Sequence, residues 1–391
     1  MAGLNDGSIG TLLPYLIETY NISTSFMGIM YATSFAGWAL MAVIMLFTVA
    51  GLGRKGALVI GAIFYAISQV LRIWTPPFPL YAVTFFLASL GQAYQDVQAN
   101  VFVSEIKASH LYLGLIHAIY SLGLLVAPLI GNTIASQAPG QWPYYYTVPF
   151  GIALLNITLV LAAFFDKEDY REIRRLSQFG KPEASQFTET RSRRSTEGSS
   201  TFKETIQEMK ETLSYRAVWQ LSLFYFFYLG ASAAVGGWTV LFLTKSAGYV
   251  PTGTFLGSFL ARLLMAHLTH TWLGGEHWML MIYCTINLAL QLVAWLVNNV
   301  IATSVAVSVM GFFFGPFFAS GMQIRGNALA FILVVAQLGA SIFPAVTGVV
   351  ASSKGVIVLQ PIAVALIVLT AISWWFVPTA LREKPGDGVM D

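Results

Sequence analysis

The sequence predicts an all-α integral membrane protein of twelve helices, arranged as two six-helix repeats. Its composition is the first reason: 56% of the residues are hydrophobic and 10% are charged, against roughly 25% charged residues in soluble domains. Charge placement is the second, because residues 166–216 hold 11 of the 21 Lys and Arg residues and 10 of the 18 Asp and Glu residues. The third is a succession of apolar segments near the ~20 residues that one bilayer crossing needs.

These segments must be helices, because lipid offers no hydrogen-bonding partner to an open backbone. The alternating short strands of a membrane barrel are missing from the sequence. We expect one short span followed by eleven full ones, at roughly 7–20, 27–50, 57–75, 79–104, 111–136, 143–165, 217–244, 250–268, 277–298, 299–321, 327–351 and 355–378.

Basic residues set the expected orientation, since Lys and Arg gather on the cytoplasmic side of membrane proteins. They follow the even-numbered spans, and all but four of the 21 then lie inside or at that boundary; the exceptions are Arg72, Lys245, Arg262 and Lys354. Both termini are therefore expected in the cytoplasm. We divide the chain into a first half (1–165), a charged cytoplasmic linker (166–216), a second half (217–380) and a cytoplasmic tail (381–391).

Two matches between the halves indicate an internal repeat. Residues 31–42 align without gaps to residues 255–266 with five identities, which pairs the second span with the eighth. Residues 123–128 and 339–344 both begin with Gly and end with Pro, which pairs the fifth span with the eleventh. Repeated halves of this kind are typical of secondary transporters.

Four stretches carry a family likeness: Gly3 to Pro14, Gly91 to Asn100, His117 to Gly123, and Tyr228 to Trp238. With these, nearly the whole chain resembles fungal major facilitator superfamily transporters of the fucose-permease-related branch. The resemblance implies the twelve-helix major facilitator fold and a small-molecule substrate bound between two halves that open alternately to each side.

Gly53, Arg54 and Lys55 match the cytoplasmic gating loop of that superfamily. Ala50 stands where the superfamily's loop signature carries an Asp, which puts the usual charge network of this face in doubt. The seventh span also lacks the acid that relatives often carry there.

The fifth span contains Gly114, Gly123, Pro128 and Gly131, a pattern that resembles the glycine-proline signature associated with antiporters. We expect these four residues to permit close helix contact and bending.

Asp96 is the one acid deep within a predicted span, and at 100° per residue it shares a helix face with Gln92 and Gln95. Acids inside lipid are costly and usually functional. Asp96 could be a proton-coupling carboxylate, a substrate hydrogen-bond acceptor beside the two glutamines, or a structural acid tied to neighbouring helices.

Asp6, with Asn5 as its packing neighbour, is a second candidate for substrate or proton binding. Only five residues precede it, whereas relatives carry a longer apolar lead-in, so the first helix is expected to be truncated. Arg262 is expected to snorkel or to serve the structure, with anion binding as the alternative. His117 could hydrogen-bond across the cavity or belong to the core.

No metal site is expected, because no Cys or acid pair completes a set with the dispersed histidines. No nucleic acid is expected as a partner, since the basic cluster in the linker is short and mixed with Ser, Thr and Glu. Asn21 begins an Asn-Ile-Ser glycosylation sequon on the predicted outer side.

The sequence therefore predicts a monomeric, multi-pass secondary transporter of the plasma membrane. It is not expected to be an enzyme or to use a cofactor, and without a phosphate-binding loop for ATP a proton gradient is the expected energy source. The fifth-span pattern favours export of a small fungal metabolite, and the kinship with fucose permeases favours the alternative, import of a sugar or polar nutrient. Ala50 and the short first span keep a third class open, a transport-inactive receptor or scaffold.

Overall fold

The computed structural model describes residues 1–22, 27–104, 106, 109–137, 140–163, 207, 210, 213–247, 252–271, 275–297, 299–318 and 326–377. Most of the predicted linker 166–216 and the whole of the predicted tail 381–391 lie outside these residues.

The first half consists of helices that cross back and forth between the two ends of the molecule. They are α1 (Ala2–Tyr20), α2 (Met27–Ile73), α3 (Phe78–Ser104), α4 (Ser109–Gln137), the short 3₁₀ helix η2 (Trp142–Tyr146) and α5 (Thr147–Ala163). α1 begins five residues before its expected start and has 19 residues, which gives a length of about 28 Å.

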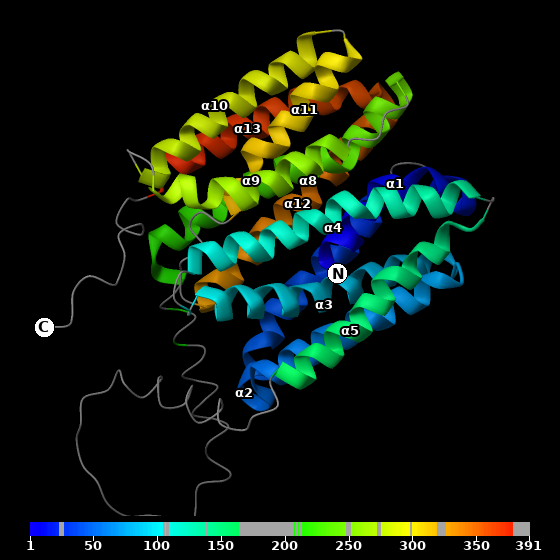
Figure 1. The fold of residues 1–391 in the computed structure, drawn as a ribbon, viewed down its shortest axis with the longest axis vertical. Helices are drawn as coiled ribbons and strands as arrows, with labels where there is room; N and C mark the ends of the chain where they lie inside the picture. Colours follow the sequence, from blue (N-terminus) through cyan, green and yellow to red (C-terminus); the bar gives the residue numbers. More distant parts are fainter. Residues whose placement is uncertain are drawn as a thin grey trace, which may run out of the picture.

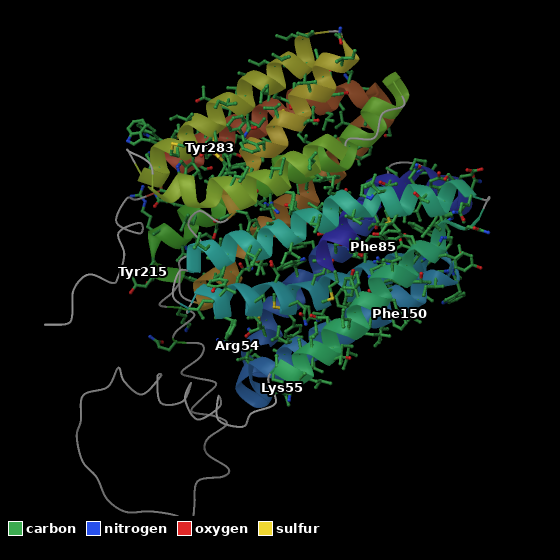
Figure 2. All side chains as sticks on the ribbon, in the orientation of Figure 1. Arg54, Lys55, Phe85, Phe150, Tyr215 and Tyr283 are labelled. Atoms are coloured by element: carbon green, nitrogen blue, oxygen red, sulfur yellow. The ribbon has the colours of Figure 1, made fainter. Side chains whose placement is uncertain are left out.

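α2 contains two of the predicted spans, joined at a sharp corner. Gly53 has φ 70° and ψ 179° there, a conformation outside the helical region that side chains rarely adopt and glycine adopts freely. The corner separates residues 27–52 from residues 54–73, as expected for the second and third spans. Figure 2 shows Arg54 and Lys55 at this corner, at the same end of the molecule as Tyr215; we call it the Arg54 end.

The second half repeats the arrangement. Its helices are α8 (Arg216–Ala247), α9 (Thr252–Thr271), α10 (Gly275–Leu296), α11 (Val300–Phe314) with the 3₁₀ turn η3 (Gly315–Phe318), α12 (Gly326–Lys354), the 3₁₀ turn η4 (Val356–Val358) and α13 (Leu359–Trp375). With α2 counted as two spans, the described residues form the twelve helical segments that the sequence predicts, and the all-α prediction is confirmed.

The helices lie side by side in two groups (Figure 1). Helices α1 to α5 form one group and α8 to α13 the other, and the two meet where α4 packs on α9 and where α2 packs on α12. The Cys284 thiol is buried within the second group.

Many large apolar side chains point outward, as a lipid-facing surface requires. Ile301 is 73% exposed and Leu296 is 72% exposed. Eight segments of the described chain are long and apolar enough to cross a membrane by length and composition. Four helical segments of the described chain fall outside those eight: α13 is apolar but shorter, and α1, α3 and α9 carry polar side chains that face inward, described below.

The repeat is visible in how helices approach one another. A Cβ atom added to Gly123 of α4 would lie 2.9 Å from the backbone nitrogen of Leu4 in α1. A Cβ atom added to Gly339 of α12 would collide in the same way with the backbone of Phe226 in α8. Gly123 and Gly339 are the residues that the sequence repeat pairs, so both halves use a glycine to bring corresponding helices into backbone contact.

We therefore expect Gly123→Ala to destabilise the protein by about 1–3 kcal/mol, because α1 must move away from α4 to make room for the methyl group. Thermal unfolding of the purified, detergent-solubilised protein measures the effect. Gly131→Ala on the same helix is the matched control, since its nearest neighbouring atom would be 3.6 Å away. Equal melting temperatures for the two variants would contradict this account of the α1–α4 contact.

Candidate functional site

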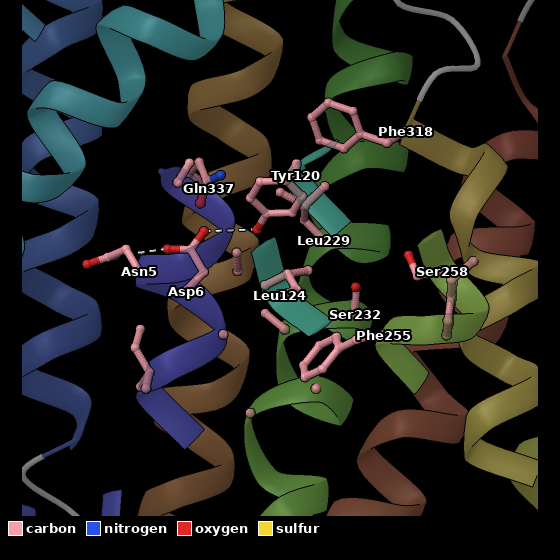
Figure 3. Close-up of a pocket in the computed structure, with 18 of the residues that line it drawn as sticks. Asn5, Asp6, Tyr120, Leu124, Leu229, Ser232, Phe255, Ser258, Phe318 and Gln337 are labelled. Carbon is pink, nitrogen blue, oxygen red and sulfur yellow. Dashed lines mark hydrogen bonds between the residues drawn. The ribbon is translucent and has the colours of Figure 1, made fainter. Parts of the chain in front are cut away.

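A cavity of about 270 Å³ lies between the two halves, near the middle of the helices. Side chains from α1, α2, α3 and α4 line one side, and side chains from α8, α9, α11 and α12 line the other. Figure 3 shows part of this cavity, with Asp6 and Tyr120 on the side toward Leu229, Phe255 and Phe318 and with Asn5 behind Asp6.

Asp6 is held at the cavity wall by neutral hydrogen-bond donors from three helices. Its Oδ1 atom accepts from Asn5 Nδ2 at 3.0 Å and from Gln92 Nε2 at 3.1 Å. Its Oδ2 atom accepts from the Tyr120 hydroxyl at 2.9 Å, and the first and last of these bonds are drawn in Figure 3. Three of the residues that the sequence singled out, Asn5, Asp6 and Gln92, thus meet at one point.

Asp96 lines the same cavity one helical turn beyond Gln92 on α3. Its Oδ1 atom accepts from Asn100 Nδ2 at 3.0 Å, and no cation pairs with it within the described part of the chain. The Asn100 side chain continues to His117 of α4, with 3.1 Å between Asn100 Oδ1 and His117 Nε2. Both alternatives for His117 hold in part, since it is buried and hydrogen-bonded and also lines the cavity.

Gln95 does not share the cavity with Gln92 and Asp96. Its Nε2 atom donates to the carbonyl of Leu58, and its Oε1 atom accepts from Asn156 Nδ2 at 3.2 Å. Consecutive residues are 100° apart on a helix, so Gln95 lies at one edge of the predicted face and turns toward α2 and α5, while Asp96 lies at the other edge and turns inward.

Arg262 joins the two halves. This α9 side chain is 8% exposed, its NH1 group donates to the His117 carbonyl at 3.0 Å and to the Ser121 hydroxyl of α4, and its Nε donates to the Gly315 carbonyl at 3.4 Å. Its guanidinium also lies 5.6 Å from the centre of the Tyr120 ring. The side chain is buried rather than snorkelling toward the membrane surface.

Most other cavity residues were not predicted from the sequence, although the internal repeat aligns several of them with one another. Tyr31, Ser34 and Trp38 line the cavity from α2, and the residues aligned with them, Phe255, Ser258 and Arg262, line it from α9. The repeat alignment thus identified equivalent positions on opposite walls, but nothing in it said that these positions face a cavity.

The two walls differ in chemistry. On α3 the cavity residues include Ser89, Gln92 and Asp96, and the same spacing gives Gly311 and Phe314 on α11 and Phe318 on η3. On α1, Asp6 lines the cavity directly before the tightly packed Gly7, and on α8, Leu229 lines it directly before the tightly packed Gly230. Both carboxylates of the cavity belong to the first half, whereas the second half presents mainly rings, aliphatic groups and small residues, with Arg262 and Gln337 as its charged and amide side chains.

The sequence profile described as Major Facilitator Superfamily matches residues 1–324. The chain belongs to this superfamily. The match covers the first half and most of the second, which agrees with the two-group arrangement of helices around a central cavity. The protein is thus a multi-pass integral membrane protein of a transporter family, and the prediction that it is not an enzyme is confirmed.

Similar proteins agree with this assignment. The chain is 21% identical over 414 residues to Bypass of stop codon protein 6 of Saccharomyces cerevisiae, covering 97% of this chain and 80% of that protein. Its fold is similar to that of the major facilitator transporter FucP in the outward conformation, with a TM-score of 0.62, 18% identity, and coverage of 96% of this chain and 97% of that one. A point variant of the Escherichia coli fucose:proton symporter FucP gives a TM-score of 0.64 at 18% identity, covering 96% and 95% of the two chains.

The predicted gating loop lies away from the cavity, at the Arg54 end. Gly53 forms the corner of α2, and the Arg54 guanidinium lies 5.3 Å from the centre of the Phe102 ring near the end of α3. Lys55 is half-buried beside it. The side chain of Ala50, where the superfamily usually has an Asp, lies outside the described residues.

The fifth-span residues Gly114, Gly123, Pro128 and Gly131 all lie on α4. Gly114 is buried, and Gly123 makes the contact with α1 described above. Asn21 is exposed at the opposite end of the molecule, where it ends α1 in a left-handed conformation with φ 49°, and the Ser23 of its sequon lies outside the described residues.

We expect Arg262→Met to separate α4 from α9, because each hydrogen bond from a charged donor contributes roughly 1.5–3 kcal/mol. Spin labels at Leu111 and Leu264, both exposed on these helices, would report a longer distance by double electron–electron resonance. The labels require Cys284→Ala, since Cys284 is the one cysteine of the chain. The same labelled pair with Arg262 present is the control, and an unchanged distance distribution would show that Arg262 does not hold the halves together.

Proposed function

We propose that the chain is a proton-coupled secondary transporter of a small organic molecule, which binds in the cavity between the halves and is released by alternating access. The observation that carries the proposal is the pair of carboxylates, Asp6 and Asp96, on the wall of one central cavity. Both carboxylates lie on helices of the membrane-spanning bundle, where a charge exposed to lipid would be costly. The cavity instead gives them access to substrate and protons.

Asp96 is the proposed proton-coupling residue, because its carboxylate has one hydrogen-bond donor and no pairing cation among the described residues. Asp6 and Gln92 are proposed to bind substrate, with Asn5 behind them. Gln95 then serves by fixing α3 to α2 and α5 rather than by touching the substrate.

The asymmetry of the walls supports an amphiphilic substrate. Carboxylates and amides on one side accept and donate hydrogen bonds, while Phe314, Phe318 and Leu229 opposite them bury an apolar face. Export of a metabolite with a polar edge and an apolar ring fits this arrangement and the antiporter-like pattern of α4.

Import of a sugar is the second candidate. The observation in its favour is the shared fold with a fucose:proton symporter, together with the hydrogen-bonding groups of α1 and α3. A sugar would use the carboxylate wall for its hydroxyl groups and the aromatic wall for its ring face.

The proposed setting is the plasma membrane, with the protein as a monomer, both termini in the cytoplasm and Gly53, Arg54 and Lys55 on the cytoplasmic face. What supports this orientation is the excess of Lys and Arg at that face.

We expect Asp96→Asn to lower proton-coupled flux at least about fivefold while folding and expression persist, because coupling between two sites is typically worth 5–150-fold. The measurement uses purified protein in liposomes with an entrapped pH-sensitive dye. L-Fucose, myo-inositol and 4-nitrophenyl α-L-fucoside are applied as gradients in each direction. The amphiphilic site predicts faster proton movement with the aryl glycoside than with myo-inositol.

Glu18→Gln is the matched control, because Glu18 is an exposed acid on α1 outside the cavity. Wild-type flux in Asp96→Asn would remove Asp96 from the coupling step. No flux with any probe, together with unchanged melting temperatures in the presence of all three, would favour the receptor or scaffold alternative.

The sequon tests the orientation. If the termini are cytoplasmic, Asn21 faces outward, and we expect peptide N-glycosidase F to increase the electrophoretic mobility of protein expressed in a fungal host. Asn21→Gln should abolish that shift. Thr158→Ala, which removes the second sequon within α5, should leave it unchanged, and a shift that survives Asn21→Gln would contradict the assignment.

A further inference from the structure

Arg72 is a buried cation in the middle of the first half. It lies near the end of α2 and is 1% exposed. Positive charges in membrane proteins are usually placed where they reach water or an acid, and Arg72 is one of the four basic residues that the orientation rule did not explain. Its position therefore requires a local cause.

The guanidinium is held on several sides. Arg72 Nε donates to the Thr84 hydroxyl at 2.7 Å, and Arg72 NH1 donates to Asn5 Oδ1 at 2.7 Å. The Phe85 ring centre lies 4.1 Å from the guanidinium carbon, and the Tyr146 ring centre lies 5.2 Å from it. Stacking and two hydrogen bonds fix the group in one orientation.

No carboxylate in the described residues contacts this guanidinium directly, and its NH2 group has no partner there. An ionised group in a low-dielectric interior is strongly unfavourable without compensating charge. The nearest acid along the hydrogen bonds is Asp6. Arg72 donates to the oxygen of the Asn5 amide, and the nitrogen of that amide donates to the Asp6 carboxylate. Asn5 is 3% exposed and Asp6 is half-buried at the cavity, so the Arg72–Asn5–Asp6 series runs from a buried cation to a carboxylate at the cavity wall.

The contacts determine how the Asn5 amide is oriented. Its oxygen accepts from Arg72 NH1 at 2.7 Å and from Gln69 Nε2 at 3.5 Å, and its nitrogen donates to Asp6 Oδ1 at 3.0 Å. A flipped amide would set donors against the guanidinium and an oxygen against the carboxylate, so the donor pattern excludes it. Arg72 thereby dictates that Asn5 presents its NH₂ group to Asp6.

We propose that Arg72 is the positioning residue of Asp6: through the Asn5 amide it supplies the counter-charge of the Asp6 carboxylate and fixes that carboxylate at the cavity wall. The inference rests on the proposed function only for the role of Asp6 in transport. The Arg72–Asn5–Asp6 series itself is a property of the fold and can be tested without a substrate.

The experiment is a double-mutant cycle on thermal unfolding of the full-length protein in detergent. Arg72→Met removes the charge and keeps an apolar stem against Phe85. We expect it to lower the melting temperature by about 1–4 °C more in the Asp6 background than in the Asp6→Asn background, since only the former leaves a half-buried carboxylate without its counter-charge. Additive effects would overturn the proposal.

Asp96→Asn provides the matched control background. Asp96 is also an acid on the cavity wall, but none of its hydrogen bonds leads to Arg72 or Asn5. Arg72→Met should therefore cost the same with and without the Asp96 carboxylate. Coupling to Asp96 as strong as that to Asp6 would point to a general field of buried charge and would overturn the specific link.

Arg72→Lys distinguishes charge from packing. It keeps the positive charge and loses the planar group that stacks on Phe85. If Arg72 acts on Asp6, Arg72→Lys melts at a higher temperature than Arg72→Met when Asp6 is present. In the Asp6→Asn background this difference in melting temperature disappears. If Arg72 only fills space, Lys behaves alike in both backgrounds, which would overturn the proposal.

Transport assays separate this inference from the proposed function. Coupling between Arg72 and Asp6 in the melting cycle, without flux of any of the three probes, would support the Arg72–Asn5–Asp6 series and contradict only the transport proposal. Flux that requires Asp6, without coupling in the cycle, would overturn the inference and leave the transport proposal standing.

Discussion

The structure depends on one constraint: the charged side chains inside the helix bundle need hydrogen-bonding partners from the protein itself. Around the bundle there is lipid-facing apolar surface, so Asp6, Asp96, Arg72 and Arg262 must be satisfied by the protein itself. Each is held by hydrogen bonds to other side chains or to backbone carbonyls, and the described residues record no direct ion pair among them. The partners of Asp6, Arg72 and Arg262 include side chains or carbonyls of other helices, so holding these three charges also fixes how the helices pack, whereas the donor to Asp96, Asn100, lies on α3 itself.

The two halves meet this constraint differently although they are built alike. Gly123 and Gly339 bring corresponding helices into backbone contact, so the framework of the two cavity walls is shared. The side chains on that framework are not, since Asp6 and Asp96 lie on one wall and Leu229 and Phe318 lie at matching places on the other. A duplicated scaffold with both carboxylates on one wall and a more apolar wall opposite gives a single asymmetric site rather than two equivalent ones.

The cavity and the contact between the halves are physically connected. Asn100 bridges Asp96 and His117, and the His117 carbonyl accepts from Arg262 of the other half. The Phe318 ring, also from the other half, packs edge-on against His117 with 4.4 Å between the ring centres. The Asp96 carboxylate is therefore linked by a short series of contacts to the interface between the halves.

The sequence alone determined the membrane class, the all-α fold, the spans to within a few residues, the internal repeat and the placement of Asp96 inside a helical span. It did so because apolar length, Lys and Arg placement and the costliness of buried acids are read residue by residue. Only the tertiary structure turned Gln95 away from the cavity, brought Asp6 to it beside Gln92, and gave Arg72 its partner. These depend on which helices are neighbours and on how each is rotated, and side chains 67 residues apart, such as Asn5 and Arg72, meet for reasons that no local pattern records.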